Sequence, residues 1–125
     1  MITTFNKFDN DDNYIYHGTG RGQSLHIQND GYMKTNNTGD EKPSISFTND
    51  INYAKYYAKY KGGESKMVIL RTKLNDKFKI SDKVKNGKVK EYVTFDNLLS
   101  NELEILMPSG WHNLNNWNVI FDEPK

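Results

Sequence analysis

The chain of 125 residues contains no cysteine. This absence excludes a disulfide framework, a thiolate nucleophile and a zinc site with cysteine ligands, and it is typical of proteins of the reducing cytosol. Histidine is also scarce. The three histidines, His17, His26 and His112, are dispersed and lack the close spacing of metal ligands. We therefore expect no metal centre.

Membrane and secretion signals are missing as well. The first residues, MITTFNKFDNDDN, lack the basic and apolar regions of a secretory signal, and no apolar run approaches membrane-spanning length. A dominant charge is also absent, because 17 Lys+Arg oppose 16 Asp+Glu, so no overall basic field argues for nucleic acid. We expect one cytoplasmic domain over residues 1–125, with 1–13 as a poorly determined N-terminal segment, and no membrane contact.

The residue patterns indicate an α+β fold with few helices and mostly antiparallel strands. Helices are expected over 23–29, closed by Gly31, and after Asn49 or Asp50 up to Gly62-Gly63. Asn86-Gly87 indicates a hairpin within the lysine-rich segment 77–90. Strands are expected at YIYHGT (14–19), SISFT (44–48), KMVILRTKL (66–74), ELEILMP (102–108) and WNVIF (117–121), with a helical turn at DNLLS (96–100).

Two glutamates open the expected strand in NELEILMPSG, residues 101–110. Side chains alternate between the faces of a strand, so Glu102 and Glu104 are expected to point the same way. Two like charges on one face are tolerated at a solvent-facing edge, or they are kept where a cleft needs two carboxylates. The spacing alone leaves both interpretations open.

Three stretches, YHGT (16–19), SISFTNDINYAKYYA (44–58) and NELEILMPSG, follow one another at expected strands. Together they resemble the ADP-ribosyltransferase superfamily. YHGT resembles the histidine-type branch, whereas SFT and ELEILMPSG resemble the arginine-type branch of bacterial toxins and ecto-enzymes. The resemblance extends over residues 14–121 and implies a split β-sheet core of two packed, mostly antiparallel sheets, with NAD as the co-substrate.

The resemblance also implies roles for individual residues. Glu104 would stabilise the oxocarbenium-like state that forms when the nicotinamide bond of NAD breaks, and Glu102 would orient or deprotonate the acceptor. His17 would bind an adenosine-ribose hydroxyl, and the missing side chain of Gly18 would let its backbone approach nicotinamide. Thr19 would support the loop of the NAD site, and Arg21 or Arg71 would bind the pyrophosphate. Ser46, beside Thr48, would hold the nicotinamide ribose or Glu104. Tyr57 or Tyr56 would stack on the nicotinamide ring.

Four of these residues also have structural interpretations. Glu102 suits a solvated strand edge, and a lone histidine on an aromatic strand, such as His17, is more often structural than functional. Thr48 suits the start of the following helix. Tyr57 shares a helix face with small and apolar residues, which favours core packing over ring stacking.

The expected function is an intracellular NAD-dependent mono-ADP-ribosyltransferase with a macromolecular acceptor, either a protein side chain such as arginine or a nucleic acid. The many Asn, Lys, Tyr and Ile residues are typical of an AT-rich genome, such as that of a phage or a low-GC bacterium. Because 125 residues leave no room for a separate delivery domain, we expect the protein to act in the cell that makes it, as a phage-encoded modifier of host or defence machinery, or as a toxin or defence component. The alternative is a non-catalytic module that binds NAD, ADP-ribose or a protein partner on the same fold, for example an inhibitor of a defence system. A small-molecule acceptor and an RNA 2′-phosphotransferase are less favoured.

Overall fold

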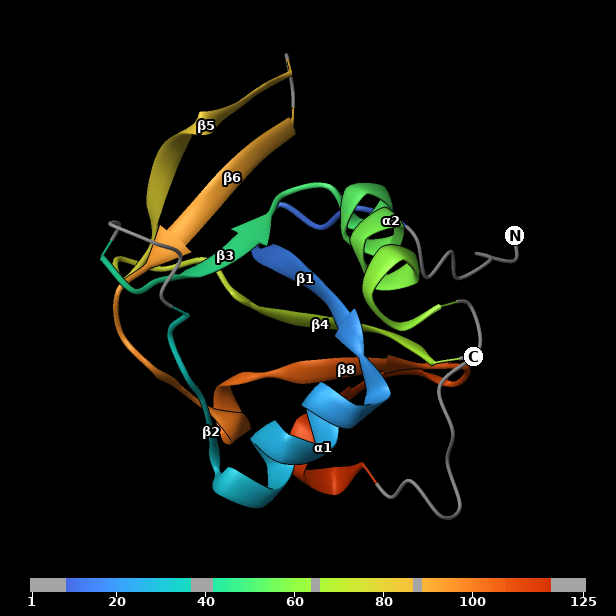
Figure 1. Cartoon of the computed structure of the whole chain (residues 1–125). Coiled ribbons are helices and arrows are strands. Elements are labelled where there is room, and N and C mark those ends of the chain that lie inside the picture. The colour runs from blue at the N-terminus through green and yellow to red at the C-terminus, as the bar shows by residue number, and fades with distance from the viewer. Residues whose placement is uncertain (1–8, 37–41, 64–65, 87–88, 118–125) are drawn as a thin grey trace.

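The computed structural model describes residues 9–36, 42–63, 66–86 and 89–117 (Figure 1). These segments form an α+β structure with a seven-stranded sheet, a two-stranded sheet and few helices, which confirms the expected fold class. The large sheet contains β1 (Tyr14–Gly20), β3 (Ile45–Thr48), β4 (Met67–Lys73), β5 (Lys79–Asn86), β6 (Val89–Thr94), β8 (Glu104–Met107) and β9 (Gly110–Asn113). The remaining elements are α1 (Arg21–Asp30), α2 (Ile51–Gly62), the small sheet of β2 (Tyr32–Met33) and β7 (Leu98–Leu99), and the 3₁₀ turns η1 (Ser100–Glu102) and η2 (Leu114–Asn116).

The large sheet is split between β1 and β3. Its strands follow the order β5-β6-β3-β1-β4-β8-β9, with antiparallel pairing throughout. β1 pairs with β4 along its whole length, but it pairs with β3 only at Tyr16↔Thr48. The strands β5, β6 and β3 therefore form one half of the sheet, and they diverge from β1, β4 and β8 in Figure 1.

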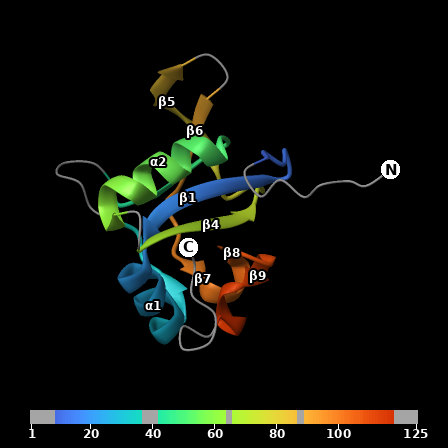
Figure 2. The ribbon, with the colours of Figure 1, turned by 90° about the vertical axis from the view of Figure 1, so that its right-hand side faces the viewer.

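The two faces of the sheet bury different clusters because side chains alternate along β1. Ile15 packs into the larger cluster with Ile27 of α1, whereas Tyr16 packs with Ile51 and Ala54 of α2. The two helices accordingly lie on opposite sides of β1 and β4 (Figure 2). Tyr16 therefore marks the face that α2 covers.

Local signals define both helices much as expected. α2 begins after Asp50, whose carboxylate accepts a hydrogen bond of 3.1 Å from the backbone N–H of Asn52, and it ends at Gly63 with φ of 73°. α1 begins at Arg21, two residues earlier than expected, and ends at Gly31 with φ of 83°. Both terminal glycines have the positive φ that other residues rarely adopt.

The C-terminal part of the described chain differs most from expectation. The strand expected from residue 102 begins at Glu104, because residues 100–102 form η1, and the segment expected as a helical turn forms β7 and the start of η1. β8 turns back into β9, a strand that the sequence analysis missed. The antiparallel pairing of β5 with β6 confirms the hairpin. Residues 87–88 of its turn and residues 118–121 of the last expected strand lie outside the described residues.

Candidate functional site

The first two motifs meet at the split in the sheet. The Nδ1 atom of His17 lies 2.7 Å from the backbone oxygen of Ser46 on β3, and the two rings of His17 and Phe47 have centroids 5.3 Å apart. A carbonyl oxygen can only accept a hydrogen bond, so Nδ1 carries the proton in this contact. His17 thus connects the two halves of the sheet.

The strand β3, which carries SISFT of the second motif, has one face toward α2. Cross-strand partners share a face, so the pair Tyr16↔Thr48 places Thr48 on the side of the sheet that α2 covers. The Thr48 hydroxyl accepts a hydrogen bond of 3.1 Å from the Asp50 backbone N–H, which confirms that this threonine helps to start α2. Ser46 lies two residues away on the same strand and is exposed. Of these two hydroxyl residues, Ser46 is therefore the one that a ligand can reach.

β6 adds a glutamate that the sequence analysis did not single out. Glu91 is the cross-strand neighbour of Thr48, so it lies on the same face. The side chain is half-buried, and its Oε1 atom is buried without a hydrogen-bond partner among the described residues. A buried carboxylate oxygen without a partner is costly, and such groups call for an explanation such as a bound ligand or water. The sequence signal that points to it is the start of the run EYVTF, where the lysine-bearing arm turns apolar.

The helix α2 covers the face of the sheet on which Glu91 lies, and Tyr53 is the tyrosine of this helix on which the Glu91 charge acts. Burial raises the pKa of Tyr53, and the neighbouring Tyr57 and the negative charge of Glu91 raise it further. The rings of Tyr53 and Tyr57 meet edge to face, with centroids 5.4 Å apart. Tyr57 is 44% exposed, so the interpretation of this residue as part of the core is wrong. The residues of α2 that do pack on the sheet are Ile51, Ala54 and Ala58.

Gly18 serves the packing of α2 on the sheet. A Cβ atom at this position would lie 1.9 Å from the backbone oxygen of Ala54 and 2.7 Å from the backbone nitrogen of Ala58. The space beside Gly18 is filled by α2, so nicotinamide cannot approach its backbone from this face, contrary to expectation. Thr19 is buried within β1 rather than placed in a loop.

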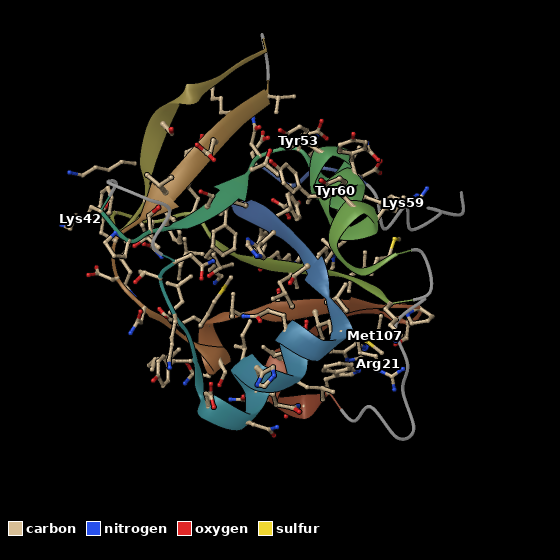
Figure 3. All side chains as sticks on the ribbon, viewed as in Figure 1. Arg21, Lys42, Tyr53, Lys59, Tyr60 and Met107 are labelled. Carbon is tan, nitrogen blue, oxygen red and sulfur yellow. The ribbon has the colours of Figure 1, made fainter. Side chains whose placement is uncertain are left out.

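Arg21 lies apart from the tyrosines. It is the first residue of α1, and its backbone N–H donates a hydrogen bond of 2.9 Å to the backbone oxygen of Lys66. In Figure 3 Arg21 lies well below α2 and apart from Tyr53. The structure does not bring Arg21 together with Glu91.

Glu104 belongs to a separate cluster. The Arg71 Nε atom donates a hydrogen bond of 2.7 Å to Glu104 Oε1, and the guanidinium carbon of Arg71 lies 3.7 Å from the ring centroid of Tyr14 and 4.3 Å from that of Trp111. Strands β1 and β4 lie between β8 and β3. At about 4.8 Å per strand, Glu104 is about 14 Å from Ser46, so Ser46 cannot hold it. The ion pair also occupies Arg71, the second candidate for the NAD pyrophosphate.

Glu102 does not form the expected pair with Glu104. It lies in η1, where its carboxylate accepts hydrogen bonds of 2.7 Å from Lys77 Nζ and 2.9 Å from the backbone N–H of Leu99. The hydrogen bond from Lys77 lowers the pKa of Glu102, partial burial opposes this change, and the bond from Leu99 and the charge of Lys77 lower it further. A general base for the acceptor would need a raised pKa, so this arrangement does not support that role.

The lowered pKa makes Glu102 a source of acid sensitivity. Because the folded-state pKa lies below the usual 4.5, Glu102 stabilises the fold fully above that pH and progressively less as the pH falls through the folded-state value. We expect wild type to lose more stability between pH 7 and about pH 3 than Glu102→Gln does, measured by urea denaturation midpoints. Lys77→Gln should reduce the acid-dependent loss in the same way. Equal losses in all three proteins would contradict this role of the ion pair.

The described residues contain no group of three or more His, Asp or Glu side chains that could hold a metal ion. In the same part of the chain, none of the helices has the length and apolar character needed to cross a membrane. The chain matches no protein-family model, and no curated protein or solved structure matches it significantly.

Proposed function

We propose that the protein is an NAD-dependent mono-ADP-ribosyltransferase with a macromolecular acceptor, and that Glu91, rather than Glu104, is the carboxylate beside the reacting ribose. The observation that carries the proposal is the buried Oε1 atom of Glu91, which has no hydrogen-bond partner among the described residues. This carboxylate lies next to the YHGT and SISFT motifs, which meet at the split in the sheet. In this proposal Glu104 has a structural role, through its ion pair with Arg71.

The chemistry suits a half-buried carboxylate. The bond between ribose C1′ and the nicotinamide nitrogen breaks, and its electron pair leaves with nicotinamide. The ribose becomes cationic in the transition state, so a negative charge held nearby stabilises it more than the ground state. A bond from the acceptor to C1′ then forms, and the acceptor proton passes to the carboxylate or to water. NAD serves as the co-substrate, and no metal is needed for these steps.

The surrounding residues complete the proposed NAD site. The exposed hydroxyl of Ser46 would bind the nicotinamide ribose, whereas His17, whose ring lies against Phe47 on the opposite face of the sheet, holds the two motifs together. Tyr57 is exposed beside Tyr53, where its ring face can stack on nicotinamide. Thr48 supports the site by starting α2. The absence of cysteine supports action in the cytoplasm, as a phage-encoded modifier or as a toxin or defence component.

The test is incubation of purified protein with NAD labelled on the adenylate, with and without cell lysate, followed by nuclease or protease digestion. Nicotinamide release, together with label in a macromolecular fraction, is the expected result. Absence of both, with lysate present, would overturn the transferase and favour the alternative, a module that binds NAD, ADP-ribose or a protein partner without catalysis.

A further inference from the structure

Four tyrosines lie along one side of α2, and all of them except the half-buried Tyr53 are exposed. Tyr53, Tyr56, Tyr57 and Tyr60 have the spacing i, i+3, i+4 and i+7, which places them along one side of a helix. Tyr56 is 67% exposed and Tyr60 is 82% exposed. Large aromatic side chains at such exposure are typical of binding surfaces rather than of an unliganded helix. We call these four residues the tyrosine face.

Positive charge borders the tyrosine face. Lys59 follows Tyr56 by three residues, so the two are neighbours on the helix surface, and Lys55 lies one turn before Lys59. Lys59 is exposed, and Figure 3 shows it projecting from α2 near Tyr60. The sequence of α2 contains no aspartate or glutamate. The helix therefore combines ring faces with one sign of charge, which complements a polyanion.

We propose that the tyrosine face binds single-stranded nucleic acid, and that this strand is the acceptor of the ADP-ribose. The identity of the acceptor rests on the transferase proposal, whereas the binding does not. Bases would stack on Tyr56 and Tyr60, and Lys55 and Lys59 would contact phosphates. A protein partner is the poorer fit, because lysine is depleted in protein interfaces and the described exposed residues of α2 include no aliphatic side chain.

The spacing of the two outer rings favours a single strand over a duplex. Tyr56 and Tyr60 are separated by four residues, or about 6 Å along the helix axis. Stacked bases in a duplex strand are about 3.4 Å apart, so bases on the two rings would be separated from each other. A single strand permits this separation, whereas a duplex resists it.

The tyrosine face leads to the proposed catalytic carboxylate. Its inner residue, Tyr53, belongs to the helix that covers the face of the sheet on which Thr48 and Glu91 lie. A strand bound on the outer rings would therefore pass near the reacting ribose. A nitrogen or hydroxyl oxygen of the nucleotide would bond to C1′ as nicotinamide leaves, and its proton would pass to Glu91 or to water.

The binding is tested without NAD by fluorescence anisotropy of labelled DNA and RNA single strands of about 20 nucleotides, which exceeds the site size of one small module. The double variant Tyr56→Ala/Tyr60→Ala should bind roughly 100-fold more weakly, at about tenfold per lost stacking ring. The double variant Lys55→Gln/Lys59→Gln should lower the slope of log affinity against log salt by about 1.4, at about 0.7 per phosphate contact. A duplex of the same length should bind more weakly than either strand.

A matched control lies elsewhere on the surface. Phe95 is an exposed aromatic residue whose ring lies 4.7 Å from Lys42 Nζ, and Figure 3 places Lys42 on the other side of the molecule from Lys59. The double variant Phe95→Ala/Lys42→Gln removes the same residue classes and should leave the affinity unchanged. Unchanged affinity in the tyrosine variant, equal losses in this control, or no binding of either strand by wild type would overturn the proposal.

The failures of the two proposals can be told apart. Binding that depends on Tyr56 and Tyr60, without any nicotinamide release, would leave the nucleic-acid surface standing and overturn the transferase. Transfer of label only to a protease-sensitive fraction would retain the transferase and overturn the single-stranded acceptor.

Discussion

Replacing Glu91 by glutamine is expected to lower the rate of nicotinamide release from NAD by roughly 10²- to 10³-fold, the range seen when one preorganised electrostatic group is lost. Glutamine keeps the shape of the side chain but removes the charge that would stabilise the cationic ribose. The same change should not weaken the fold, because it removes a carboxylate whose Oε1 atom is buried without a partner among the described residues. Single-turnover rates and urea denaturation of the same preparation measure the two effects.

Glu104→Gln is the control variant for this experiment. Its carboxylate accepts the Arg71 hydrogen bond of 2.7 Å and is only 33% exposed, so its loss should cost about 1 to 3 kcal/mol of stability. Nicotinamide release by the folded protein should stay within about threefold of wild type, since an effect near 0.6 kcal/mol is all that a distant residue should contribute. If Glu104→Gln abolished release while Glu91→Gln retained it, the assignment first drawn from NELEILMPSG would be correct and the present one wrong.

Gly18→Ala is expected to destabilise the protein by about 3 kcal/mol or more, at the upper end of the cost of overpacking a core. The added Cβ atom would meet backbone atoms of Ala54 and Ala58, the nearest at 1.9 Å. Backbone atoms cannot rotate away as a side chain can, so α2 would have to move off β1. The free energy of unfolding from urea denaturation measures the loss.

Gly22 provides the matched glycine. It lies in α1, and a Cβ atom there would meet nothing within 4 Å. Gly22→Ala should therefore stabilise the protein by about 0.5 to 1 kcal/mol through the better helix propensity of alanine. Opposite signs at the two positions would support close packing of α2 on β1. A cost below about 1 kcal/mol for Gly18→Ala would contradict that packing.

Much of the fold follows from local signals that can be recognised in the sequence. Asp50 caps α2, Gly31 and Gly63 end the two helices, and a run of aromatic and β-branched residues identifies β1. Each of these signals acts within a few residues along the chain, so it can be recognised without knowledge of distant contacts. The α+β class and the hairpin of β5 and β6 were predicted on this basis.

Such local signals do not predict the C-terminal strands correctly. Residues 100–102 form η1 because their backbone and side-chain groups find partners elsewhere, such as the hydrogen bond of 2.9 Å from the Ser100 N–H to the oxygen of Gly31. Lys77 lies 25 residues before Glu102 in the sequence, yet it binds the Glu102 carboxylate. The alternation of NELEILMPSG could not reveal either contact.

The sequence by itself determined the class of the fold, the places where the helices start and stop, and the motifs around His17 and Ser46. Only the tertiary structure decided which carboxylate accompanies them. Strand order separates Glu104 from Ser46 by two intervening strands, whereas cross-strand register sets Glu91 beside Thr48. Strand order and register depend on pairings between distant segments, and a strand pattern specifies the alternation of faces but not the neighbour that each face will meet.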